Sequence, residues 1–211
     1  MFTGIILHQG KVEELIQKEH GAVLKVRVGD WDTPIEGGES IANNGVCLTV
    51  AGIEDDVISF DLLPETLRCT TLGALKSGAP INLERSLELG DKMGGHMVFG
   101  HVDCMARMIG TQEEGSFLVM SFEADPEHVR MLVPKGSVAL DGISLTVGPV
   151  REREFEVYLI PETLERTTLG TLKPGEAVNL EIDMLARYVH QYVSAREAGA
   201  QAELDPAQGS R

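Results

Sequence analysis

The stretch Ser40–Val50 reads Ser-Ile-Ala-Asn-Asn-Gly-Val-Cys-Leu-Thr-Val, and a similar one follows 97 residues later. The second stretch, Ser137–Val147, reads Ser-Val-Ala-Leu-Asp-Gly-Ile-Ser-Leu-Thr-Val. The same spacing continues as far as Glu84 and Glu181, and 21 of the 45 positions from Ser40 to Glu84 match without a gap. A match of this length indicates an internal duplication. We therefore expect two copies of one unit, each of roughly 100 residues, which is enough for a compact domain.

Composition excludes several classes of protein. The formal net charge of −15 disfavours a nucleic-acid partner, because phosphate binding needs clusters of Lys and Arg. There is no apolar run long enough to span a membrane, and the first residues lack the basic and apolar segments of a secretory leader. The three cysteines are not closely spaced, which argues against a disulfide framework or a CxxC metal site. We expect a reduced, cytoplasmic protein without a membrane partner.

Each copy of the repeated stretch predicts a tight turn followed by an exposed strand. Asn43-Asn44-Gly45 tolerates positive φ, and the strand after it alternates between apolar and polar residues. Cys47 and Thr49 therefore share one face in the first copy, and Ser144 and Thr146 share it in the second. One interpretation is a polar ligand surface in each unit; the alternative is an ordinary solvated face of a sheet.

The rest of each unit predicts short strands and one brief helix. The first unit has strand patterns at 2–7, 11–17, 22–28, 46–50, 57–63 and 80–84. Residues 64–73 begin with Pro and end with Gly, as short helices do, and this pattern recurs at 161–170. Six short strands per unit favour a small closed barrel or a sandwich.

The units differ where the second begins, after the glycine-rich linker 87–95. Extending the spacing of 97 residues backwards places Phe99 on Phe2 and His101 on Gly4. His101 is a candidate acid or base, because imidazole titrates near neutral pH; a purely structural histidine is the alternative. His96 and His101 lack further ligands at workable spacing, so we predict no metal site. Cys47 has no basic neighbour in the sequence, so we expect it to make polar contacts rather than to act as a nucleophile.

The last segment predicts an amphipathic helix that the first unit lacks. Leu185, Tyr188, Val189 and Tyr192 follow the i, i+3, i+4 rule, and Asp183 is a plausible N-cap. This helix could pack on its own domain or on a partner chain. The sequence thus predicts units at 1–95 and 96–183, a helix at 184–199 and a disordered tail at 200–211.

The ordered motifs together resemble the riboflavin synthase family, alpha-chain type, with its tandem lumazine-binding repeats. The resemblance covers residues 1 to about 190. The motifs that carry it are Met1–Ile5, Ser40–Val50, Asn82–Arg85, Gly94–His96, Gly100–Asp103, Ser137–Val147, Ile160–Thr167 and Asn179–Asp183.

This resemblance implies a mainly β fold, with two six-stranded Greek-key barrels and a C-terminal helix that holds a homotrimer. The implied reaction transfers a four-carbon unit between two molecules of 6,7-dimethyl-8-ribityllumazine. It yields riboflavin and 5-amino-6-(D-ribitylamino)uracil, and it needs no metal or other cofactor. Lumazine synthase is a candidate partner. The alternative is a non-catalytic lumazine- or flavin-binding optical protein.

The resemblance also implies one lumazine pocket per barrel. His101, Ser144 and Thr146 would move protons, whereas Cys47 and Thr49 would orient the other ring; Ser40 and Asp183 would support them. The residues implied for the first pocket are Gly4, Ile5, Ile6, Ser40, Cys47, Leu48, Thr49, Asp61, Leu62, Leu63, Pro64, Glu65 and Thr66. Those implied for the second are Gly100, His101, Val102, Lys135, Ser144, Leu145, Thr146, Tyr158, Leu159, Ile160, Pro161, Glu162, Thr163 and Asp183.

Overall fold

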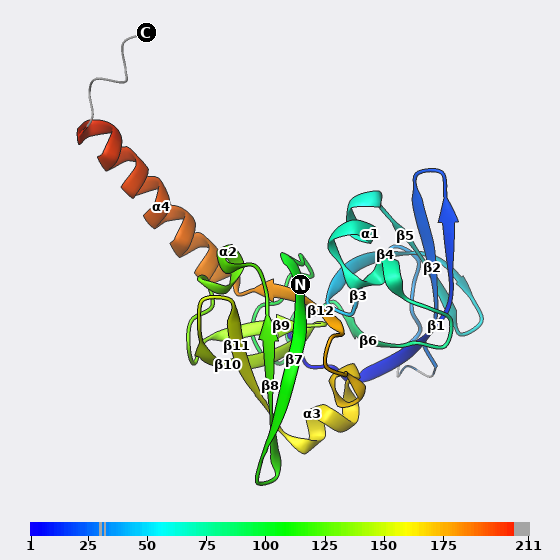
Figure 1. Ribbon diagram of the computed structural model, residues 1–211. Coiled ribbons are helices and arrows are strands. Elements are labelled where there is room, and N and C mark those ends of the chain that lie inside the picture. Colours follow the sequence, from blue (N-terminus) through cyan, green and yellow to red (C-terminus); the bar gives the residue numbers. More distant parts are fainter. Residues whose placement is uncertain (30, 32, 205–211) are drawn as a thin grey trace.

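The computed structural model describes every residue except 30, 32 and 205–211. It contains two six-stranded antiparallel barrels in tandem, followed by a long helix that leads away from them (Figure 1). This architecture confirms the fold that the repeat and the resemblance predict.

The first barrel has the strand order β1-β2-β5-β4-β3-β6 and is closed by the pairing of β6 with β1. Because β6 returns to lie beside β3 after the β3-β4-β5 meander, the connection is a Greek key. A short helix α1 (Pro64–Cys69) and a 3₁₀ turn η1 (Thr71–Ala74) connect β5 to β6. The strands are β1 (His8–Lys18), β2 (Gly21–Arg27), β3 (Ser40–Asn43), β4 (Val46–Glu54), β5 (Val57–Leu62) and β6 (Pro80–Arg85).

The second barrel repeats this order as β7-β8-β11-β10-β9-β12. It also repeats the short helix as α3 (Pro161–Arg166) and the 3₁₀ turn as η2 (Thr168–Thr171), and it adds α2 (Pro126–Val129) before β9. Its strands are β7 (Cys104–Glu114), β8 (Phe117–Glu123), β9 (Ser137–Leu140), β10 (Ile143–Val150), β11 (Glu154–Leu159) and β12 (Ala177–Ile182).

The alternation in the repeated stretch decides which side chains fill each barrel. Val46, Leu48 and Val50 of β4 are buried, whereas Thr49 is exposed and Cys47 is half-buried. Ile143, Leu145 and Val147 of β10 are likewise buried in the second core. The predicted polar face is therefore present on both β4 and β10.

The spacing between the repeats changes along the chain, and this corrects one expectation. β7 and β8 begin 96 residues after β1 and β2, whereas β9 and β10 begin 97 residues after β3 and β4. The second unit therefore carries one extra residue between its second and third strands. The predicted correspondence of Phe99 with Phe2 and of His101 with Gly4 is wrong. Gly100 is the counterpart of Gly4.

The predicted strand at 2–7 is also wrong, because only Phe2 makes an isolated bridge, to Val98. Residues 1–7 and 96–103 are two irregular segments that run between the barrels, and we call them the crossing segments. Phe2 and Val98 are fully buried there with Ala42 and Ala139. Their apolar side chains pack in this interface rather than in a barrel wall, which explains the strand-like pattern.

The C-terminal helix α4 (Met184–Leu204) is longer than predicted. Residues 200–204 were expected to be disordered but are helical, consistent with the high helix propensity of Ala, Gln, Glu and Leu. Residues 205–211 lie outside the described part of the chain. Leu185, Tyr188, Val189, Tyr192 and Val193 are exposed along the helix. No described helix is long and apolar enough to cross a membrane.

The barrels meet through backbone contacts and buried side chains. Gly45 and Gly142, at the tips of the two repeated turns, lie back to back. The Asn82 side chain bonds to the Asp141 carbonyl oxygen (3.1 Å) and to Thr168 (2.9 Å) in the second unit. Asn179 makes the reciprocal contact with the Asn44 carbonyl oxygen (2.8 Å). The two units therefore form one packed interface related by an approximate twofold axis.

One position in this interface should make stability depend on pH. Burial raises the pKa of Asp141 to about 7, and its counterpart in the first unit is Asn44. Each side chain accepts one backbone N–H at 2.8 Å. A carboxyl group with a raised pKa binds its proton more tightly in the folded state, so its contribution to stability falls as pH rises from about 4 to about 7. Urea titrations should show this fall in the native protein, on the order of a few kcal/mol, and a flatter profile in Asp141→Asn. Equal slopes of the free energy of unfolding against pH in the two proteins would contradict this prediction.

Candidate active site

One crossing segment lies against β4 and the other lies against β10, in both cases beside the polar face of the strand. The backbone N–H of Cys47 donates to the carbonyl oxygen of Gly100 (3.0 Å), and that of Ser144 donates to the carbonyl oxygen of Gly4 (2.8 Å). We define the first site as Cys47 and Thr49 with residues 100–102. The second site is Ser144 and Thr146 with residues 4–6.

This arrangement exchanges the segments that the sequence assigned to the two pockets. Ile6 is buried in the core of the second barrel, although it precedes the first strand of the first barrel. Val102 packs against the core of the first barrel. The predicted grouping of residues 4–6 with Cys47, and of residues 100–102 with Ser144, is therefore wrong. Sequence order alone does not reveal that each unit lends its first residues to the other.

Two glycines allow this close contact. Gly4 and Gly100 have φ values of 75° and 78°, in the left-handed region that glycine adopts most readily. A Cβ atom on Gly4 would lie 2.6 Å from the Ser144 Cβ atom, and one on Gly100 would lie 2.7 Å from the Cys47 backbone nitrogen. Only glycine fits at these two positions without a shift of the neighbouring strand.

Two glutamates hold the crossing segments in place, the half-buried Glu84 and the buried Glu181, and the sequence did not predict either as a site residue. The Glu84 carboxylate accepts N–H groups from Thr3 (2.7 Å) and Gly4 (3.0 Å). Glu181 accepts N–H groups from Phe99, Gly100 and His101 at 2.6 to 3.0 Å. Burial raises the pKa of both carboxyl groups, although these hydrogen bonds oppose the rise. The signal available in the sequence is the repeated Asn-Leu-Glu motif at 82–84 and 179–181, which also belongs to the motifs that carry the resemblance.

The two histidines beside the linker occupy different sites. The His96 Nδ1 atom lies 2.7 Å from the Ser144 Oγ atom, so His96 belongs to the second site. His101 is exposed beside Phe99, and its backbone follows Gly100 in the first site. His101 therefore lies next to Cys47 along this segment, rather than beside Ser144 and Thr146 as predicted. The sequence thus assigned His101 to the other site and did not predict His96 as a site residue.

Among the cysteines, Cys47 is the one that reaches a site. It is half-buried beside the Phe2 and Val98 cluster, and its Cβ atom faces Gly100. Cys104 begins β7 and packs against the second core, and burial raises the pKa of its thiol to about 12. Cys69 ends α1, and all three thiols are free. Burial therefore disfavours the reactive thiolate form of Cys104.

The remaining predicted residues surround these faces. Ser40 lies opposite Thr49 in the β3–β4 register, and Leu48 and Leu145 are buried beneath the two sites. Leu63 and Ile160, the N-caps of α1 and α3, are exposed and apolar. Asp61, Pro64, Glu65, Lys135, Tyr158, Pro161 and Glu162 are also exposed; Leu62 and Leu159 are buried; and Thr66 and Thr163 are half-buried.

The expected cap by Asp183 is confirmed, since its carboxylate accepts the N–H of Leu185 at 3.0 Å. Glu65 and Glu162 lie in the first turns of α1 and α3. Neither helix has a side-chain cap bond, and Glu162 pairs with Arg166 at 3.3 Å. The carboxylates at both helix starts thus remain on the surface, close to the ends of β5 and β11.

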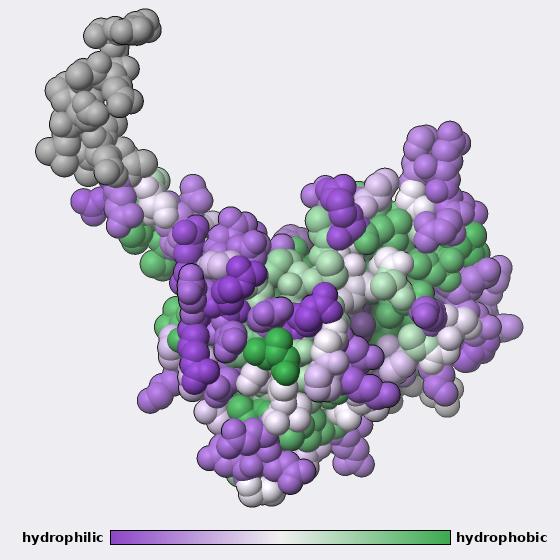
Figure 2. Space-filling model, viewed as in Figure 1, coloured by the Kyte–Doolittle hydropathy of each residue, from purple (hydrophilic) through white to green (hydrophobic). Residues whose placement is uncertain are grey.

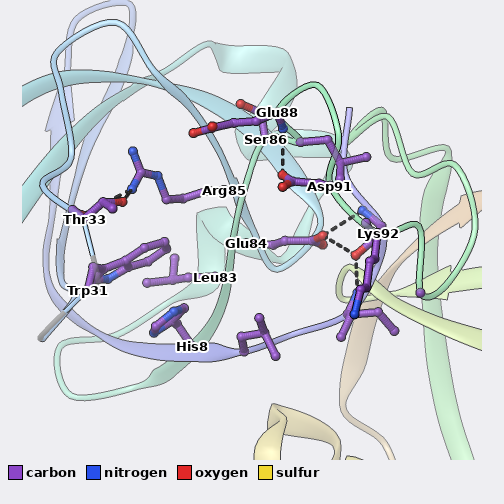
Figure 3. Close-up of a pocket in the computed structure, with 15 residues that line it drawn as sticks. His8, Trp31, Thr33, Leu83, Glu84, Arg85, Ser86, Glu88, Asp91 and Lys92 are labelled. Carbon is purple, nitrogen blue, oxygen red and sulfur yellow. Dashed lines mark hydrogen bonds between the residues drawn. The ribbon is translucent and has the colours of Figure 1, made fainter.

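A cavity of about 620 Å³ lies beside the second site (Figure 3). Ile5 is the one predicted site residue among those that line it. His8 stacks on Trp31 at 4.2 Å along one wall, and Arg85 lies nearby, 5.9 Å from the Trp31 ring centre. The Arg85 guanidinium is already held by Glu39 (2.8 and 3.0 Å) and by the Thr33 carbonyl oxygen (3.2 Å). These bonds connect the β2–β3 loop, which contains Thr33 and Glu39, to Arg85 of β6.

The fold and the paired sites define a class of tandem ligand-binding repeats, and comparison with known proteins agrees. The family model described as the lumazine binding domain matches twice, at residues 3–86 and 99–183. Among solved structures, LumP complexed with riboflavin superposes with a TM-score of 0.76 at 25% identity, over 86% of this chain and 99% of that one. LumP complexed with 6,7-dimethyl-8-(1'-D-ribityl) lumazine superposes with a TM-score of 0.75 at 22% identity, over the same shares of the two chains.

The sequence relatives are more specific. Riboflavin synthase from Brucella abortus (strain 2308) is 46% identical over 193 residues, covering 89% of this chain and 96% of its own. Riboflavin synthase from Escherichia coli (strain K12) is 41% identical over 204 residues, covering 93% and 95%. The chain belongs to the riboflavin synthase family, as its motifs indicated.

Proposed function

We propose that this chain converts two molecules of 6,7-dimethyl-8-ribityllumazine into riboflavin and 5-amino-6-(D-ribitylamino)uracil. The observation that carries the proposal is the pair of sites with the same backbone and different polar groups: Cys47 and Thr49 in one, Ser144 and Thr146 in the other. Two similar ligands with unequal roles in one reaction need such a pair. The near full-length similarity to riboflavin synthases supports the same reaction.

The four-carbon transfer requires one lumazine to lose a proton from its 7-methyl group while the other is attacked at C7. The rings must face each other, and binding both in fixed orientation replaces a two-body encounter with a positioned pair. Such positioning can lower a barrier by roughly 7 kcal/mol or more. Leu63 and Ile160, which follow β5 and β11, are exposed apolar side chains suited to contact with a ring.

The polar residues of the two sites supply the proton chemistry in this proposal. Thr49 and Thr146 are exposed on their strands, where their hydroxyl groups are accessible to a ligand. His101 carries an exposed imidazole next to the first site, and Ser144 carries a hydroxyl group in the second. His101 in the first site and Ser144 in the second therefore handle protons at different ligands.

We further propose that α4 holds the chain in a homotrimer. Its exposed apolar side chains extend away from the barrels, and Figure 2 shows hydrophobic residues on the described part of this helix. Contact with other copies would bury this surface and would bring a first site of one chain to a second site of its neighbour. Sedimentation of the native protein should show a species of three chains. The double variant Tyr188→Glu and Tyr192→Glu should sediment as a smaller species.

Replacement of His101 by Gln should slow turnover by at least about tenfold and leave lumazine binding nearly unchanged, because Gln keeps a polar side chain but cannot carry a proton. The measurement is kcat for riboflavin formation beside the lumazine Kd from fluorescence. Unchanged kcat would remove His101 from the proton chemistry, whereas a large rise in Kd with unchanged kcat would assign it to binding.

The alternative function, a lumazine- or flavin-binding optical protein, is suggested by the likeness to LumP structures. One experiment separates the two functions. Purified protein is mixed with 6,7-dimethyl-8-ribityllumazine in chelator-treated buffer. Riboflavin at half the molar amount of lumazine consumed supports the synthase. Tight binding with a fluorescence change but without riboflavin supports the optical protein.

A further inference from the structure

We infer that His96 is a positioning residue of the second site, which accepts the Ser144 hydroxyl hydrogen and directs the Oγ lone pairs toward the bound ligand. The inference rests on the proposed function. Its basis is the contact of 2.7 Å between His96 Nδ1 and Ser144 Oγ, which is a normal hydrogen-bond length.

The backbone at His96 is held in place by its neighbours. The backbone N–H of His96 donates to the carbonyl oxygen of Thr3 (3.1 Å), and Thr3 is in turn held by the half-buried Glu84 through its N–H and its hydroxyl group. The preceding Gly95 packs against Thr3 and Ser144 so closely that a Cβ atom would lie 2.7 Å from the Ser144 Cβ atom. The crossing segment therefore determines where the imidazole meets Ser144.

The surroundings favour the neutral ring. Burial lowers the pKa of His96, and the charge of Asp183, at the end of β12, only partly opposes this. The Nε2 atom is buried without a hydrogen-bond partner among the described residues. A charged ring would need an acceptor for an N–H at each nitrogen, and Nε2 has none among the described residues. In the neutral form that we assign, Nδ1 accepts and the one N–H lies on Nε2. Ser144 then donates to His96 and keeps both lone pairs for the ligand.

The first site has no such arrangement. The counterpart of Ser144 there is Cys47, which lies beside Gly100. A thiol is also a weaker hydrogen-bonding group than a hydroxyl. Orientation by His96 is thus specific to the second site and is one physical source of the unequal roles of the two sites.

Three variants test this inference. His96→Leu should lower kcat by about 10- to 100-fold with little change in lumazine Kd, because Ser144 would lose its orientation. His96→Asn should recover part of that loss, since its amide oxygen can accept from Ser144. In a Ser144→Ala background, His96→Leu should have an effect of less than about twofold, because residues that act as a unit are not additive. His128→Asn is the matched control: its Nδ1 is also buried without a partner, and kcat should stay within about twofold.

The pH profile supplies a readout that a merely structural role would not change. As pH falls through the His96 pKa, the ring becomes a donor, so native kcat should decline on the acid side; His96→Asn should lack that decline. Ser144, which contacts the ring, and Asp183, whose charge acts on it, are the same in both proteins. Additive effects of His96→Leu and Ser144→Ala would overturn the inference. Absence of riboflavin from the native protein would instead overturn the proposed function.

Discussion

Gly100→Ala should abolish the first site, although Gly100 belongs to the second unit in sequence. The added Cβ atom would meet the Cys47 backbone nitrogen at 2.7 Å, and alanine is strained at φ +78°. The contact involves backbone, so β4 or the crossing segment must move. Since misplacement of a bound reactant by about 1 Å can cost 100-fold, we expect kcat to fall by at least about 100-fold.

Ligand binding identifies which site is lost. Gly100→Ala should bind one lumazine per chain instead of two. Adding Thr49→Ala should change nothing further, whereas adding Thr146→Ala should weaken the remaining site. The grouping by sequence order predicts the opposite result. Gly110→Ala is the control, because a Cβ atom there meets nothing within 4 Å, and both sites should remain.

Gly142→Ala should produce the largest loss of stability. A Cβ atom at this position would lie 2.8 Å from the Gly45 nitrogen and 2.9 Å from its Cα atom, and φ is +79°. Neither barrel can relieve the contact by a side-chain rotation, because the facing atoms are backbone. Strain and overpacking together should lower the free energy of unfolding by about 3 kcal/mol or more, measured by urea titration.

Gly175→Ala separates the two causes of that loss. Gly175 has a φ of +93°, but a Cβ atom there would meet nothing within 4 Å. This variant should lose only about 1 to 2 kcal/mol, from backbone strain alone. An equal loss in both variants would show that the contact between the turns contributes nothing.

Much of the fold could be predicted because each pattern in one repeat could be checked against the same pattern in the other repeat. A turn and an alternating strand that occur twice are unlike a chance pattern, so β4, β10 and the polar faces of Thr49 and Thr146 followed from the sequence. The length of α4 was underestimated, because the helix continues past Gly199. The strand at 2–7 was predicted wrongly, because Phe2 is buried by the other unit and not by a barrel wall.

The assignment of residues to sites could not be predicted, for a physical reason. Which strand receives Gly4 or Gly100 depends on contacts between residues over 50 positions apart, such as Gly4 with Ser144, and nothing in the local pattern encodes it. His96 was missed for the same reason, since its partner Ser144 lies 48 residues away. Glu84 and Glu181 were visible as a repeated motif, but their role as acceptors for a distant backbone was not.

The crossing segments also bear on how such a chain could have arisen. A single repeat, standing alone, would leave its polar strand without the segment that covers it. Two identical single-repeat chains could supply that segment to each other around the same twofold axis, and each pocket would then be alike. Joining them into one polypeptide kept the exchange and allowed the two pockets to diverge, so that Cys47 and Ser144 now occupy equivalent places. Two identical chains related by a twofold axis cannot have chemically unequal pockets, whereas two repeats joined in one polypeptide can.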